Sequence, residues 1–253
     1  MARYKAQNFL GNQYTRIYDP YTGETNDILG AKILLYDDFL NTTIHTTTEH
    51  GPWVVHDIHA DATEAIVANQ SAGVVGMHIG ATGAEQEAGL STSDSLVFNL
   101  DKGLVFECRA NIHVLPTLLT EIYFGLGGAF VKGRLAIADE GPLVHAMFHH
   151  SLAGGVAGGL AHIYTDDGAT DNDGVTTATT LTVDTFYTFR IDVHDATSVK
   201  FYINGARVAS TTTFSMANGA NVCVQPMFMV YKDAGAGLGD LYVDNVKLWQ
   251  LSR

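Results

Sequence analysis

The sequence contains little cysteine: its 253 residues include only Cys108 and Cys223, and no CxxC pair occurs. That absence excludes zinc or redox motifs built on such pairs. Both cysteines lie in segments that alternate apolar residues, LVFECRANI and VCVQPMFMV. We therefore expect two free thiols carried on strands in a reducing compartment, rather than a disulfide.

Long apolar runs are also lacking. No stretch reaches the ~18 residues that a membrane-spanning helix needs. The N-terminal stretch MARYKAQNFLGNQYTRIYDP has no apolar segment of a signal peptide after its early charges. We expect a soluble protein that is not exported by a signal peptide.

Basic residues are scarce: 14 Lys and Arg stand against 27 Asp and Glu, a formal net charge of −13. A nucleic-acid groove needs clustered Lys and Arg to displace counterions, so this balance argues against nucleic acid as a partner. With 46% hydrophobic residues and only 16% charged, the chain is able to bury a full core.

Residues 1–30 differ from the rest of the chain. They show no helical or strand periodicity, and DPYTGET (19–25) is typical of a turn, so we predict an irregular arm. The arm is slightly basic and rich in aromatic residues. It either packs on its own body, contacts a partner, or is a frayed terminus. The candidate partner-binding residues are Arg3, Tyr4, Lys5, Phe9, Tyr14, Arg16, Tyr18 and Tyr21.

Residues 31–253 are predicted to form one all-β domain. About eleven short segments rich in β-branched and aromatic residues are separated by Gly, Asn, Asp, Ser or Thr, and several alternate clearly, such as residues 105–112. Only DATEAIVANQ (61–70) has the composition of a short helix. Strands without helical spacers predict two stacked antiparallel sheets.

The order and spacing of several segments, over about residues 33–250, resemble those of a known protein family. They are YDDF, DATEAIVANQSAGVVGMHIGAT, an EQEAGL loop, KGLVFECRANI, EIYFGLGG, a DDGATDNDG loop, FYTFRIDVHDATSVKFYINGARVAS and GLGDLYVDNVKLWQ. Together they resemble the concanavalin A-like lectin/glucanase jelly roll, in the form found in bacteriophage virion proteins. The resemblance implies a two-sheet sandwich, but such a fold carries many functions.

The phage form of the resemblance implies a virion structural protein, assembled in the host bacterial cytoplasm. A capsid decoration, cement or tail-associated protein would bind the major capsid protein or another virion protein through its arm and loops. It would also be a homo-oligomer, for example a trimer. No membrane partner and no cofactor are expected.

Enzymatic activity is not expected. Glycosidases of this superfamily resemble one another in a Glu-x-Asp-x-x-Glu strand, which no glutamate here begins. Glu85-Gln-Glu87 is interpreted as a solvated acidic loop, whereas Glu107 and Glu121 lie on strands without an acidic neighbour in sequence. Hydrolysis remains the third hypothesis, carried by Glu107 or Glu121.

Metal ions and glycans are the remaining candidate ligands. The eleven histidines contain no HExxH motif, and the adjacent His149 and His150 would face apart on a strand. No metal site is predicted, although one acidic loop offers weak candidates for Ca²⁺. These are Asp166, Asp167, Asp171 and Asp173. For a glycan-binding module Trp53 is the candidate platform, with a core tryptophan as the competing interpretation.

The segment VKFYINGARVAS (199–210) is predicted to be a hairpin. Asn204-Gly205 suits the two positive φ angles of a type I′ turn, and Phe201 and Ile203 alternate with Lys200 and Tyr202. We interpret it as scaffold rather than as a site.

Overall fold

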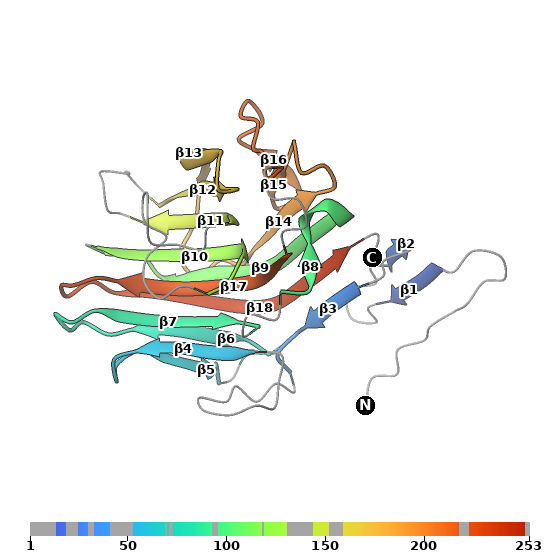
Figure 1. Ribbon diagram of the computed structural model, residues 1–253. Helices are drawn as coiled ribbons and strands as arrows, with labels where there is room; N and C mark the ends of the chain where they lie inside the picture. The colour runs from blue at the N-terminus through green and yellow to red at the C-terminus, as the bar shows by residue number, and fades with distance from the viewer. Residues whose placement is uncertain are drawn as a thin grey trace.

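The computed structural model describes residues 14–18, 25–29, 33–40, 53–68, 70, 73–92, 96–117, 119–130, 144–151, 159–217 and 223–250. Two stacked sheets dominate it, and each contains eight strands (Figure 1). Every strand pairing in the two sheets is antiparallel. Among the described residues, no helix is long and apolar enough to cross a membrane.

The first layer is called the β10 sheet. In spatial order it contains β13 (Asp171–Thr180), β12 (Leu160–Asp166), β11 (His145–Ser151), β10 (Thr120–Gly127), β17 (Cys223–Lys232), β7 (Gln86–Ser91) and β4 (Val54–Ile58). The short β8 (Phe98–Asn99) pairs with β17, and the 3₁₀ turn η1 (Leu100–Lys102) follows it.

The second layer is called the β9 sheet. Its order is β16 (Ala206–Val208), β15 (Lys200–Ile203), β14 (Tyr187–Val193), β9 (Leu104–Val114), β18 (Gly239–Gln250), β6 (Val75–Ile79) and β5 (Thr63–Ile66). The strand β3 (Ile33–Asp37) pairs with the other end of β18. This arrangement confirms the predicted all-β sandwich.

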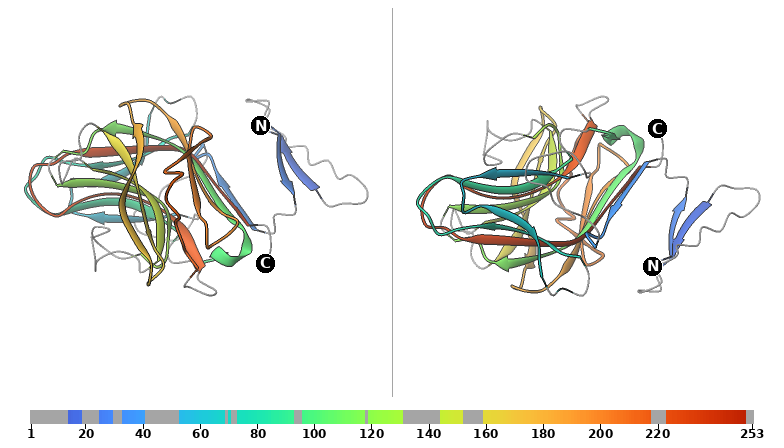
Figure 2. Two further views of the ribbon diagram at one scale, coloured as in Figure 1. Left: turned by 90° about the horizontal axis from the view of Figure 1, so that it is seen from above. Right: turned by 90° about the horizontal axis from the view of Figure 1, so that it is seen from below.

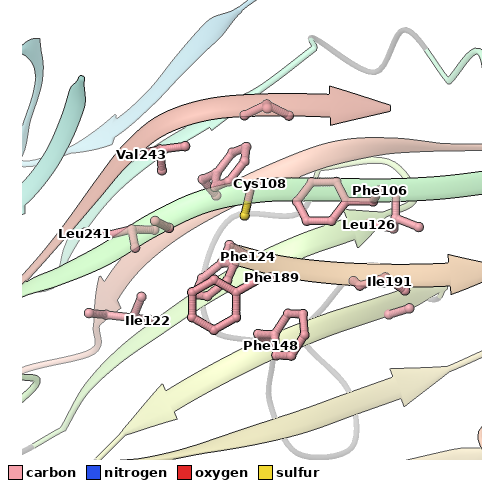
Figure 3. Close-up of a cluster of buried hydrophobic side chains, with 14 of the residues drawn as sticks. Phe106, Cys108, Ile122, Phe124, Leu126, Phe148, Phe189, Ile191, Leu241 and Val243 are labelled. Atoms are coloured by element: carbon pink, nitrogen blue, oxygen red, sulfur yellow. The ribbon is translucent and has the colours of Figure 1, made fainter. Parts of the chain in front are cut away.

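The core lies between the two sheets and is filled by alternate residues from each strand. Phe124 and Phe148 of the β10 sheet meet Phe189 of the β9 sheet edge to face, with ring centroids 4.7 and 5.0 Å apart (Figure 3). Cys108 is fully buried among them, and both cysteines are free. Burial raises the pKa of the Cys108 thiol well above its ordinary value, so this thiol is inert.

The strand predictions hold for most segments, with three corrections. Residues 61–70 contain β5 rather than a helix, because Ala62 and Glu64 are buried with the period of a strand. The segment 86–91, expected to be a loop, is the buried strand β7. The segments that form β11 and β13 were not predicted as strands, residues 171–174 having been expected to belong to a loop, and each lies on the β10 sheet.

The predicted hairpin at 199–210 is confirmed. Asn204 and Gly205 have φ angles of 49° and 76°, as a type I′ turn requires. Phe201 and Ile203 are buried in the core, whereas Tyr202 is only half-buried on the outer face.

Part of the N-terminal arm is regular, which corrects the expectation of an irregular segment. β1 (Tyr14–Tyr18) pairs with β2 (Thr25–Leu29) in a separate two-stranded antiparallel sheet. Figure 2 shows this pair outside the two layers. The predicted turn at 19–25 lies between the strands, and residues 19–24 are outside the described part of the chain.

Candidate functional site

The outer face of the β10 sheet carries a row of polar and aromatic side chains. Tyr123 of β10 is opposite His149 of β11, which is opposite His162 of β12. On the other side of Tyr123 the row continues through Met229 of β17 and Gly89 of β7 to His56 of β4. We call this set the His149 row. Its members face away from the core because their sequence neighbours face into it.

His149 is the centre of this row. Its ring stacks on Tyr123 with centroids 4.8 Å apart and meets Tyr164 edge to face at 4.6 Å. The Nε2 atom lies 3.8 Å from Oε2 of Glu121, close enough for an ion pair but too long for a hydrogen bond. Only 7% of the His149 residue is exposed. Neither of its ring nitrogens, nor the hydroxyl of Tyr123, has a hydrogen-bond partner among the described residues.

Two of the groups around His149, Tyr164 and His162, have shifted pKa values. Burial, followed by the carboxylates of Asp173 and Glu121, raises the pKa of Tyr164 to about 12. Burial and the neighbouring His149 lower the pKa of His162 from 6.5. At neutral pH Tyr164 is therefore a hydroxyl donor and His162 an uncharged imidazole.

An apolar patch adjoins this polar cluster on the same face. Tyr123, Met147, Met227, Met229 and Tyr231 form a second buried cluster, separate from the main core, and Phe130 packs against it. Gly127 leaves room for the methyl groups of Met147 and Met227, since a Cβ there would lie 2.9 and 3.0 Å from them. All five residues of this cluster are at most 4% exposed, so the cluster packs beside His149 rather than lying open to solvent.

The structure changes the interpretation of the acidic residues. Glu87 is on β7 and only 1% exposed, so the prediction of a solvated acidic loop is wrong. Glu121 and Glu87 both lie opposite Tyr231, on either side of it, and so share the outer face of the β10 sheet. Glu107 lies on the outer face of the other sheet, where Lys247 Nζ is 3.4 Å from its Oε1 atom.

The acidic candidates for Ca²⁺ serve the turn between β12 and β13. Asp166 Oδ1 accepts from Gly168 N at 2.6 Å, and Asp167 Oδ1 accepts from Ala169 N and Thr170 N at 3.0 and 2.7 Å. Asp171 and Asp173 are on β13. Burial and the neighbouring Asp171 raise the pKa of Asp173. Within the described ranges, no group of three or more His, Cys, Asp or Glu residues is arranged to hold a metal ion.

Trp53, the expected glycan platform, belongs to the core instead. It is 5% exposed, its Nε1 donates to Asp37 Oδ2 at 2.7 Å, and its ring packs between Phe39 and Phe228. A ring enclosed in this way presents no face to a sugar. The competing interpretation, a core tryptophan, is the one that holds.

The arm candidates are placed only in part. Tyr14, Arg16 and Tyr18 lie on β1, whereas Arg3, Tyr4, Lys5, Phe9 and Tyr21 lie outside the described residues. The partner-binding role of the arm stays a prediction.

Sequence reasoning missed most of the His149 row. His149 and His150 do face apart as expected: His149 faces outward, whereas His150 is fully buried on the core side. The segment HAMFHHS was not recognised as a strand because both of its faces are buried and its apolar and polar residues therefore do not alternate. If the segment is treated as a strand, the alternation of its side chains places His145, Met147 and His149 on one face.

No protein-family model and no curated protein sequence matches the chain. Solved structures do. A protein of unknown function, SO2946 from Shewanella oneidensis MR-1, is similar at a TM-score of 0.57 and 13% identity, over 92% of this chain and 93% of that one. The carbohydrate recognition domain of Emp47p is similar at a TM-score of 0.54 and 11% identity, over 89% of this chain and 99% of that one.

A variant of the family 7 alginate lyase A1-II′, solved with its product, is similar at a TM-score of 0.51 and 12% identity, over 73% of this chain and 82% of that one. At these identities the likeness concerns the fold. It supports the predicted concanavalin A-like jelly roll, which lectins and carbohydrate-active enzymes share.

Proposed function

We propose that the protein is a non-enzymatic saccharide-binding β-sandwich, which takes its ligand on the outer face of the β10 sheet over the His149 row. His149 carries the proposal. A buried imidazole with both nitrogens unpartnered among the described residues costs about 1–3 kcal/mol for each orphaned group, so such a group calls for a partner.

Sugar hydroxyls are suited to that role because each is able both to donate and to accept. An imidazole has two ring nitrogens that take hydrogen-bond partners, and the Tyr123 hydroxyl beside it is able both to donate and to accept. The similar fold of the Emp47p carbohydrate recognition domain also supports saccharide binding as the kind of function.

A catalytic role is not proposed because the carboxylates are poorly placed for a retaining pair. Glu87 and Glu121 stand two strands apart with Tyr231 between them and their backbones about 10 Å apart, whereas a retaining pair must bring its two carboxyl groups to ~5–5.5 Å from each other. Turnover of an oligosaccharide that disappears in the Glu121→Gln variant would contradict this part of the proposal.

The test is a glycan array with the full chain in calcium-containing buffer, followed by calorimetry on the strongest ligand. His149→Ala should weaken binding about tenfold or more. His59→Asn, at an exposed turn position with a φ of 81° that asparagine tolerates, is the matched control and should bind normally. A blank array, or unchanged affinity of His149→Ala, would refute the proposal.

A structural role in a bacteriophage virion is the second candidate. It is favoured by the β1–β2 hairpin, whose strands pair with each other and with no other described strand. Such a hairpin would attach the sandwich to the major capsid protein or another virion protein, and a homo-oligomer would match the symmetry of the particle. Co-sedimentation with purified particles should be lost when Arg3, Lys5 and Arg16 are replaced by Ala, and a strict monomer that binds no particle would oppose the idea.

A further inference from the structure

A polar hollow lies on the opposite side of the sandwich from the His149 row, on the outer face of the β9 sheet. It has a cavity volume of about 550 Å³, within the ~300–1,000 Å³ of typical ligand sites. We call it the Arg190 groove. Its lining residues are Glu107, Thr188, Arg190, Tyr202, Asn204 and Gly205. None of them belongs to the His149 row.

Strand register aligns the side chains of this groove. Glu107 of β9 is opposite Arg190 of β14, and Arg190 is opposite Tyr202 of β15. Beyond Glu107 the same line continues to Lys247 of β18 and to Tyr36 of β3, which is 43% exposed. Five strands side by side make this line about 19 Å long. It is long enough for several linked sugars rather than one.

Arg190 is held in a fixed orientation at the centre of the line. Its guanidinium carbon lies 5.9 Å from the ring centre of Tyr202 and 5.6 Å from that of Trp249. Its Nη2 donates to Asp192 Oδ2 at 3.2 Å. Two aromatic rings and a carboxylate therefore restrain the planar group, which reduces the entropy lost when it binds a ligand.

The remaining lining groups supply further donors and acceptors. Asn204 Oδ1 accepts from Thr188 N at 2.9 Å, and this bond leaves the NH2 group of the same side chain as a donor. The turn itself gives open access, since a Cβ added at Gly205 would meet no atom within 4 Å. The hairpin that the sequence alone indicated to be scaffold thus forms one wall of the groove.

The charges of the groove balance. Glu107 is paired with Lys247 and Asp192 with Arg190, so a strongly charged ligand would gain no net attraction. Planar carboxylate, guanidinium and amide groups bind adjacent hydroxyls through paired hydrogen bonds, and aromatic rings accept the C–H face of a sugar. We infer that the Arg190 groove binds a neutral oligosaccharide, as a second site independent of the His149 row.

The two sites face opposite ways because they lie on the outer faces of two stacked sheets. One short saccharide is unable to reach both. A protein molecule that binds saccharide at both faces therefore joins two polysaccharide molecules, and the full protein should cross-link a long polysaccharide.

Titration calorimetry of the full chain tests this inference. The probes are four neutral hexasaccharides, namely maltohexaose, cellohexaose, laminarihexaose and chitohexaose, with hexagalacturonate as the acidic comparison. We expect two sites per chain for the best neutral probe. Tyr202→Ala should remove one site or weaken it about tenfold, whereas Tyr202→Phe, which keeps the ring, should lose about threefold or less. Circular dichroism of each variant checks that it is folded.

His149→Ala separates the two proposals. A single site lost in His149→Ala and unchanged in Tyr202→Ala would overturn the groove and leave the function proposed for the β10 sheet intact. A single site with the reverse behaviour would support the groove and refute that function. No saturable binding of any neutral probe up to about 10 mM, or a preference for hexagalacturonate, would overturn the groove.

Discussion

Glu64 makes the stability of the protein depend on pH in a direction that one substitution should reveal. This side chain leaves β5 and accepts a hydrogen bond from Gly89 N of β7 at 2.7 Å, and only 8% of the residue is exposed. Burial raises its pKa from 4.5 to about 8, and the carboxylates of Asp57 and Glu87 add to the rise. At neutral pH the folded protein therefore holds a proton that the unfolded chain releases.

The sign and size of the effect follow from linkage. Because the pKa is raised on folding, the free energy of unfolding falls as pH rises from 4.5 to about 8. Each pH unit costs about 1.4 kcal/mol, so the loss by pH ~7.5 is about 2–4 kcal/mol once relaxation of the folded state is allowed for. Glu64→Gln keeps the acceptor for Gly89 without a titrating proton. The variant should be more stable by that amount at pH ~7.5 and almost unchanged at pH ~4.5.

Urea unfolding at the two pH values measures the difference directly. For a chain of this size the gain corresponds to a rise in melting temperature of about 5–15 °C. Glu85→Gln is the matched control: its carboxylate precedes β7, is only partly buried and accepts a long hydrogen bond of 3.4 Å from Tyr231. It should change stability by less than about 0.5 kcal/mol. An equal gain for Glu64→Gln at both pH values, or no gain at the higher one, would refute the reasoning.

Three further predictions concern the same sandwich. Burial lowers the pKa of His150 from 6.5 to about 4, so the free energy of unfolding should fall by about 3 kcal/mol as pH drops from 6.5 to 4. His150→Leu should remove this pH dependence in acid titrations followed by fluorescence. Lys232→Met should cost about 3 kcal/mol in urea unfolding, because the buried ammonium donates to the carbonyl oxygens of Gly80, Thr82 and Gly237; a loss under about 1 kcal/mol would contradict this. Gly205→Val should cost about 1–2 kcal/mol through its φ of 76° alone, with Gly205→Asn losing less, and equal losses would point to contacts instead.

The two proposed sites differ in what the sequence showed of them. The Arg190 groove is built from segments whose alternation is clear, so the sequence alone places Glu107 and Tyr202 on outer faces. Their meeting was not foreseeable, because Glu107 and Tyr202 come together only through the register of β14 between them.

The His149 row was hidden for a different reason. The strands β7 and β11 are buried on both faces, so their sequences lack the contrast between apolar and polar residues that reveals a strand. Gly89 added to the error, because glycine in EQEAGL suggested a loop although it lies within a ladder. Trp53 was similarly ambiguous, since an isolated aromatic residue has no periodicity to indicate which way it faces.

The sequence by itself determined the all-β class, the two-sheet layout, the free thiols and the hairpin at Asn204-Gly205. These follow from local properties, namely the period-two alternation of side chains and the preference of Asn-Gly for positive φ. Only the tertiary structure decided which residues meet on each outer face. Residues such as Tyr123, His149 and His162 become neighbours through pairing between strands, and that register depends on packing of the whole core rather than on any one segment.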